Sequence, residues 1–173
     1  MSTLYNSTDP KTKDYLAKIG EVIVTLNGLE RDISFWIWEL LAASGTPAEK
    51  QVIGRLVTNP LDFMGKINLL RSLIVHRLGE VKGKDFIKTY TLLQNCAEFR
   101  NDIAHSLWFI QYGSSPENLE TEKINEVKAF QKGKRMDYSK AVEKINIEEF
   151  DNALLVMQDA SKELLKFSHQ HFI

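Results

Sequence analysis

The segment from about Asp14 to Ala43 carries an apolar repeat that constrains the fold more than any other feature of this chain. Its apolar residues follow one another in steps of four and three, which places them on one face of an α-helix. They are Tyr15, Ile19, Val22, Leu26, Leu29, Ile33, Trp36 and Leu40. Ile23, Ile37 and Leu41 widen this face, so we expect a long helix that is covered on more than one side.

Four further helices are expected from apolar periodicity and from start and stop signals. Thr46, Pro47 and Glu49 suit a capping box with proline at the first helical position. Gly79 suits the end of the third helix. The four helices are predicted over about residues 47–57, 61–78, 84–105 and 147–169.

Residues 107–145 have a different character from the helical segments. The stretch LWFIQY is rich in residues that favour strands, and YGSSPEN has the composition of a turn. We therefore predict a hairpin or an ordered loop there, and a flexible N-terminal arm over residues 1–12. No repeat or linker divides the chain, so residues 1–173 are predicted to form a single domain. Its class is all-α, a bundle of about five helices with a short β-like or irregular insertion before the last helix.

Composition excludes several classes of function. The net charge of −1 gives no general attraction to nucleic acid or to an anionic membrane, although a local basic patch would suffice for RNA. The single cysteine, Cys96, excludes an intrachain disulfide and a cysteine zinc cluster. His169 and His171 lack further ligands at suitable spacing, so we expect no metal site.

No membrane segment is expected either. The N-terminus lacks the apolar core of a signal peptide, and the most apolar segment, ISFWIWELLAA, is interrupted by Glu39 and too short to span a bilayer. A cytoplasmic protein is therefore the expectation. Trp36 and Trp38 within this segment are expected to be packing or dimer contacts.

Three polar residues near the end of the fourth helix are the candidate catalytic residues: Arg100, Asn101 and His105. Asn101 and His105 are one turn apart on a polar line. Arg100 falls in a gap of an apolar stripe, where a guanidinium is costly unless it has a partner or borders a wet cleft. Glu30 in the first helix is one possible partner.

Arg100 and His105 do not lie side by side on a regular helix, because five residues place them about 140° apart. If both act on one ligand, three arrangements remain open. The ligand lies between them, the helix is distorted, or a second subunit brings its own copy. A purely structural role is also open, because arginine and histidine interact well with a helix C-terminus.

The stretch RNDIAH resembles the signature of the HEPN superfamily, an arginine followed four to six residues later by a histidine, often with a polar residue directly after the arginine. The specific match covers only Arg100 to His105, but the motif's late position and the helical architecture agree over most of the chain. The resemblance implies a metal-independent endoribonuclease that acts as a homodimer on RNA. It also implies a toxin–antitoxin, phage-defence or CRISPR-associated setting, with an antitoxin or defence protein as a possible partner and no cofactor.

The resemblance assigns roles to the three residues. His105 would be the general acid or base that helps the RNA 2′-hydroxyl attack the adjacent phosphate. Arg100 would stabilise the negative charge on the pentacoordinate phosphorus, and Asn101 would orient His105 or bind a phosphate oxygen. The products would carry 2′,3′-cyclic phosphate and 5′-hydroxyl ends. Some family toxins carry a modifiable tyrosine two residues after the histidine, and this chain has Leu107 there, which puts that form of control in doubt.

A basic segment between residues 123 and 144 supplies candidate RNA contacts. It holds seven lysine and arginine residues against three acidic ones, and Lys132, Lys134 and Arg135 lie at its centre. A solvated loop that happens to be basic is the preferred explanation. Two alternatives to the enzyme stay open: a catalytically inactive HEPN-like dimer that binds a protein or a nucleotide, and a helical interaction protein with no role in nucleic-acid chemistry.

Overall fold

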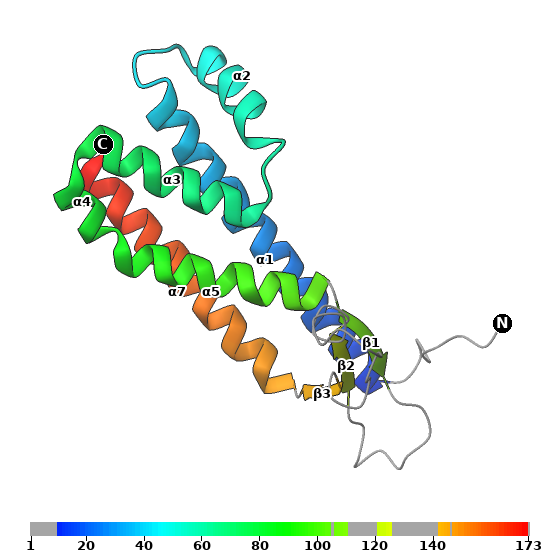
Figure 1. The fold of residues 1–173 in the computed structure, drawn as a ribbon. Helices are drawn as coiled ribbons and strands as arrows, with labels where there is room; N and C mark the ends of the chain where they lie inside the picture. Colours follow the sequence, from blue (N-terminus) through cyan, green and yellow to red (C-terminus); the bar gives the residue numbers. More distant parts are fainter. Residues whose placement is uncertain (1–9, 105, 111–120, 126–141, 146, 173) are drawn as a thin grey trace, which may run out of the picture. The chain divides into compact units, whose positions relative to one another are not determined.

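The structure of this chain is a computed structural model that describes residues 10–104, 106–110, 121–125, 142–145 and 147–172. These residues confirm the all-α class with an insertion before the last helix (Figure 1). The helices are α1 (Pro10–Leu41), α2 (Pro47–Thr58), α3 (Phe63–Leu78), α4 (Glu80–Asp85), α5 (Ile87–Ala104) and α7 (Ile147–His171). The strands are β1 (Ser106–Ile110), β2 (Thr121–Asn125) and β3 (Val142–Ile145).

Helix α1 follows the predicted apolar repeat. It begins at Pro10, inside the segment expected to be an arm, because proline's fixed φ suits the first turn of a helix. Residues 1–9 lie outside the described residues. Of the residues expected to widen the apolar face, Ile37 is buried, whereas Ile23 is 44% exposed. The buried positions are Tyr15, Val22, Leu26, Leu29, Ile33, Trp36, Ile37 and Leu40.

The predicted start and stop signals of α2 and α3 are present in the structure. Thr46 accepts from the Glu49 backbone N–H, and the Thr46 N–H donates to the Glu49 carboxylate at 2.8 Å, which completes the capping box. Gly79 ends α3 with φ at 87°, a conformation that favours glycine. The sequence did not separate α4 from α5, because a six-residue helix is too short to show a periodicity of its own.

Helix α2 docks through its small residues. Gly54 and Thr58 are its buried residues, and a Cβ on Gly54 would lie 2.0 Å from Cδ1 of Trp38. The Trp38 indole N–H donates to the Thr58 hydroxyl at 3.1 Å, and that hydroxyl donates to the Gly54 carbonyl at 2.8 Å. The predicted packing role of Trp38 is therefore confirmed, and a glycine makes room for its ring.

The chain divides into two compact units. The first unit comprises residues 1–23 and 99–153, and the second comprises residues 24–98 and 154–173. In the second unit, α1, α3, α5 and α7 pack side by side around an apolar core (Figure 1). The contacts that join successive pairs are Glu30–Lys66, Asn68–Tyr90, Lys88–Glu163 and Trp36–Phe172.

The first unit contains the insertion and the helix ends that flank it. Its three strands form one antiparallel sheet in the order β1–β2–β3, with Trp108 opposite Lys123 and Lys123 opposite Glu143. Within the predicted insertion, β1 and β2 pair antiparallel, and β3 adds a third strand. Residues 111–120 and 126–141, which complete the predicted insertion, lie outside the described residues.

Candidate functional site

The RNDIAH motif lies where α5 ends and the sheet begins. Arg100 and Asn101 belong to the last turns of α5, Ala104 is its final residue, and β1 starts at Ser106. The predicted helix end at His105 is thus correct to one residue. His105 itself lies outside the described residues.

Arg100 is half-buried and Asn101 is exposed. Among the described residues, no ion pair or hydrogen bond joins the Arg100 guanidinium to a neighbour. The possible partner named from the sequence, Glu30, instead forms an ion pair with Lys66 at 2.5 Å. Within the described part of the chain, the N–H donors and the charge of Arg100 are therefore available to a ligand. One side of the residue is already shielded from water, because it is half-buried.

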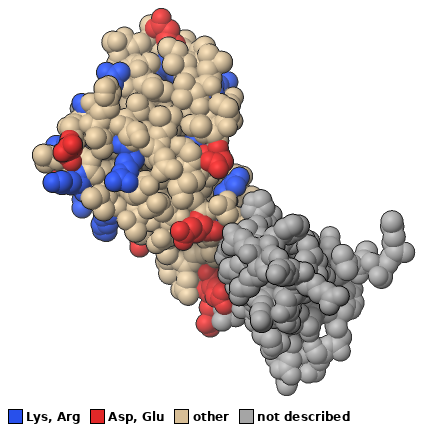
Figure 2. Space-filling view, in the orientation of Figure 1, with Lys and Arg blue, Asp and Glu red and all other residues tan. Residues whose placement is uncertain are grey.

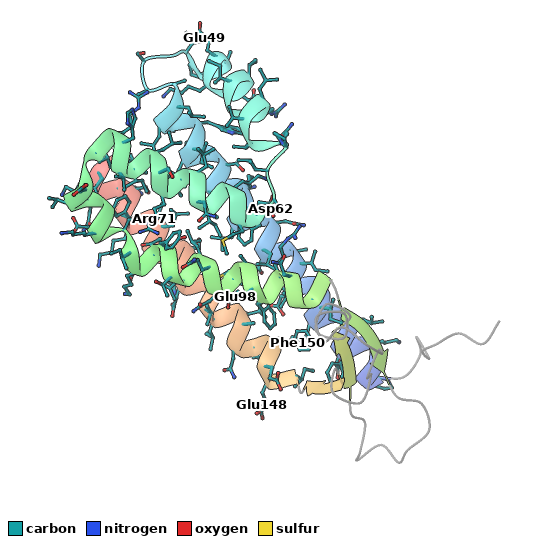
Figure 3. The ribbon with its side chains drawn as sticks, in the orientation of Figure 1. Glu49, Asp62, Arg71, Glu98, Glu148 and Phe150 are labelled. Atoms are coloured by element: carbon teal, nitrogen blue, oxygen red, sulfur yellow. The ribbon has the colours of Figure 1, made fainter. Side chains whose placement is uncertain are left out.

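Apolar neighbours fix the end of α5 that carries the motif. The Phe99 ring packs edge-to-face on Phe150, with centroids 6.4 Å apart, and the Phe150 ring packs on Tyr15 of α1 with centroids 6.3 Å apart. Phe150 is labelled in Figure 3. Ile103, one turn after Phe99, is only 8% exposed. Phe99 and Ile103 thus anchor one side of the helix end, while Asn101 projects into solvent. Such an anchor holds the motif's backbone in place.

The polar line on α5 divides into two parts with different roles. Gln94 donates to the Tyr90 hydroxyl at 3.2 Å, and that hydroxyl donates to Asn68 at 2.9 Å. The Arg71 guanidinium lies 4.5 Å from the centre of the Tyr90 ring. This network joins α3 to α5 and is structural. Glu98, labelled in Figure 3, is exposed and continues the line toward Asn101.

The candidate RNA contacts Lys132, Lys134 and Arg135 lie outside the described residues, so their placement stays a prediction. On the face drawn in Figure 2, lysine and arginine lie mainly over the upper part, with a few acidic residues between them, and aspartate and glutamate lie toward the lower end. That face therefore offers no continuous basic surface for RNA, so the predicted contacts to the RNA backbone depend on the basic segment.

Burial explains why Cys96 takes no part in the site. It lies one turn before Arg100 on α5, it is 1% exposed, and burial raises the pKa of its thiol to about 11. A thiol with such a pKa is almost wholly protonated at neutral pH and is a poor nucleophile. Within the described ranges, no three His, Cys, Asp or Glu side chains come together as ligands for a metal ion.

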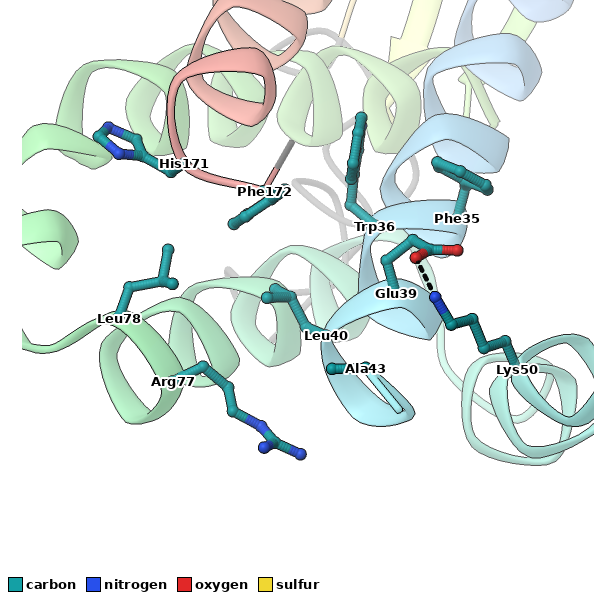
Figure 4. A pocket seen from close by; sticks show the side chains of 10 residues that line it. All are labelled: Phe35, Trp36, Glu39, Leu40, Ala43, Lys50, Arg77, Leu78, His171 and Phe172. Atoms are coloured by element: carbon teal, nitrogen blue, oxygen red, sulfur yellow. Dashed lines mark hydrogen bonds and ion pairs between the residues drawn. The ribbon is translucent and has the colours of Figure 1, made fainter. Parts of the chain in front are cut away.

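Sequence reasoning missed a pocket in the second unit, at the end where α1, α3 and α7 terminate (Figure 4). Its volume is about 560 Å³. The aromatic run FWIW in α1 was the available signal. Periodicity placed Trp36 on the apolar face and left Phe35 off it, in agreement with exposed fractions of 9% and 46%, but it could not say that the neighbouring helix ends leave a cavity there. The lining residues, called the aromatic pocket below, are Phe35, Trp36, Glu39, Leu40, Ala43, Lys50, Arg77, Leu78, His171 and Phe172.

In the part of the chain that the structure describes, none of the helices combines the length and the apolar character needed to cross a bilayer. Comparison with known proteins finds no matching family, no matching curated protein and no matching solved structure. The RNDIAH motif and its surroundings are therefore the features that bear on function.

Proposed function

We propose that this protein is a metal-independent endoribonuclease of the HEPN type, with active sites formed across a homodimer. The observation that carries the proposal is the state of Arg100, a half-buried guanidinium without a described partner, at the end of an anchored helix and five residues before a histidine. A cation in this setting is suited to bind a phosphate that arrives from outside.

The proposed reaction follows from the chemistry of the three residues. His105 takes the proton from the RNA 2′-hydroxyl, and the oxygen attacks the adjacent phosphorus. Arg100 stabilises the extra negative charge of the pentacoordinate phosphorus, and Asn101 orients the imidazole or a phosphate oxygen. The 5′-oxygen leaves with a proton from a general acid, which yields a 2′,3′-cyclic phosphate and a 5′-hydroxyl. No metal ion is required in these steps.

A homodimer would bring an arginine and a histidine of the motif together, although the two lie on different sides of one helix. Residues 100 and 105 are about 140° apart around a regular helix, so one chain does not present both side chains to one point. A two-fold axis between two copies of the α5 end places Arg100 of one chain beside His105 of the other. Each of the two sites then needs one Arg100 and one His105, and solvent water supplies the proton for the leaving 5′-oxygen. An antitoxin or defence protein that covers this cleft would control the activity.

The test is cleavage of an end-labelled, structured RNA in EDTA. Wild-type protein is expected to cut and to leave cyclic-phosphate ends, whereas His105→Ala is expected to lose at least about 100-fold in rate, the usual contribution of a general acid or base. His76→Ala is the matched control, because His76 is an exposed histidine in the last turn of α3. Equal rates of RNA cleavage by wild type and His105→Ala would show that His105 is not the general base.

The main alternative is a catalytically inactive HEPN-like dimer that binds a protein or a nucleotide. The fold alone does not distinguish this alternative from the enzyme, because a shared fold hosts both active and inactive proteins. A dimer that fails to cut a broad RNA pool in the same assay would support it.

A further inference from the structure

The aromatic pocket contains three rings with no described cation of the chain over them. The centroids of Phe35 and Trp36 are 5.0 Å apart with the rings 74° from parallel, and those of Trp36 and Phe172 are 5.2 Å apart at 47°. The rings are therefore inclined to one another, and Phe35 is 46% exposed. The cation that lies over a ring in the described part of the chain is Arg71, over Tyr90. Because the face of an aromatic ring attracts positive charge, the open rings can receive a cation from outside.

The positive charge of Lys50 is balanced within the pocket lining. Lys50 of α2 forms an ion pair with Glu39 of α1, with Nζ 2.5 Å from Oε2 (Figure 4). The other carboxylate oxygen of Glu39, Oε1, makes no contact with a described residue. A carboxylate accepts several hydrogen bonds, so Glu39 keeps an acceptor for a second positively charged group.

The positive charge of Arg77 is directed at the end of α1. Its Nη2 donates to the Leu41 carbonyl at 3.3 Å, and Figure 4 shows the guanidinium turned away from the three rings. A helix C-terminus carries about half a unit of negative charge, which offsets part of the charge of Arg77. Helices α3 and α7 also end at this pocket, and their C-terminal turns add further partial negative charge. The surroundings of the pocket therefore favour positive over negative charge.

We propose that the aromatic pocket binds a small organic cation, an alkylammonium group whose charge lies between Glu39 and the rings of Phe35 and Trp36. Glu39 follows Phe35 by four residues and Trp36 by three, so the three side chains share one side of α1. A cation there meets ring faces and a carboxylate together. The volume of about 560 Å³ lies within the range of small-molecule sites. This site does not depend on the proposed ribonuclease function.

The experiment titrates the full chain by calorimetry with choline, with its uncharged isostere in which carbon replaces the quaternary nitrogen, and with acetate. The indole N–H signal of Trp36 is followed by NMR in parallel. Choline is expected to shift this signal and to bind at least about tenfold more tightly than the isostere, because the two differ only in charge. No binding at millimolar choline, equal binding of choline and the isostere, or tighter binding of acetate would overturn the proposal.

The ion pair provides two variants with opposite expected effects. Lys50→Gln leaves Glu39 without its counter-charge and is expected to tighten choline binding about fivefold. Glu39→Gln leaves Lys50 without its counter-charge and is expected to weaken choline binding by a similar factor. A site for anions would give the reverse order for acetate and no gain for choline in Lys50→Gln, which would contradict the proposal.

A third variant tests the rings. Phe35→Leu keeps an apolar side chain at an exposed position, and it is expected to weaken choline about fivefold while leaving the isostere unchanged. Glu98→Gln is the control for the charge variants, because Glu98 is an exposed glutamate of α5 that does not line the pocket. Equal choline affinity in wild type, Phe35→Leu and Lys50→Gln would contradict the site, whether or not the protein cleaves RNA.

Discussion

Cys96 and Arg100 lie on successive turns of α5, but their exposure to solvent differs. Cys96 is enclosed by the core, whereas Arg100 keeps one side open and has no partner among the described residues. The gap that Arg100 makes in an apolar stripe could be recognised from spacing alone. Its half-buried state and the diversion of Glu30 to Lys66 could not, because both depend on contacts between segments far apart in the chain.

The thiol of Cys96 gives a prediction at this scale. Because burial raises its pKa to about 11, the folded protein should react with Ellman's reagent at pH 8 at least about 100-fold more slowly than the protein unfolded in urea. Reaction rates of folded and unfolded protein, measured side by side, check this. Equal rates would mean that the α5 core opens freely around Cys96.

At the scale of elements, the sequence predicts helices well where a period or a cap repeats over many residues. The long repeat of α1 and the capping box of α2 both appear as expected. The break between α4 and α5 escaped prediction because a six-residue helix shows no period. The attachment of α2 also escaped prediction, since its buried side consists of Gly54 and Thr58 while Leu56 is 74% exposed. The buried side of α2 therefore could not be found from its large apolar residues.

Gly54→Ala tests how α2 is attached. Alanine normally stabilises a helix interior relative to glycine by about 1 kcal/mol, but here its Cβ would lie 2.0 Å from the Trp38 ring. We expect the free energy of unfolding to fall by about 2 kcal/mol, because the ring must move and its hydrogen bond to Thr58 is lost. Urea denaturation measures the change.

Gly28→Ala serves as the matched control for Gly54→Ala. Gly28 lies within α1, and a Cβ there would meet nothing within 4 Å, so this change is expected to be neutral or stabilising by up to about 1 kcal/mol. If the two glycine variants changed stability in the same direction, the close approach of Gly54 to Trp38 would be wrong.

At the scale of the whole molecule, the chain contains two compact units, and the single domain stays a prediction. The described part of the motif lies in one of them and the aromatic pocket lies in the other. Apolar periodicity reports which residues of a helix are buried, and it carries no information on how the core is divided along a long helix. Periodicity also cannot predict a dimer, because the sequence does not show whether an exposed residue faces solvent or a second copy of the chain.

In the proposed dimer, one active site takes Arg100 from one chain and His105 from the other. Mixing two inactive variants tests this shared site most directly. Arg100→Ala and His105→Ala are prepared separately, dissociated together, and reassembled at equal concentration before RNA cleavage is measured in EDTA. Half of the dimers are then mixed, and each mixed dimer contains one intact site, so about a quarter of wild-type activity is expected. A mixture that forms mixed dimers but stays as inactive as its two parents would contradict a shared site.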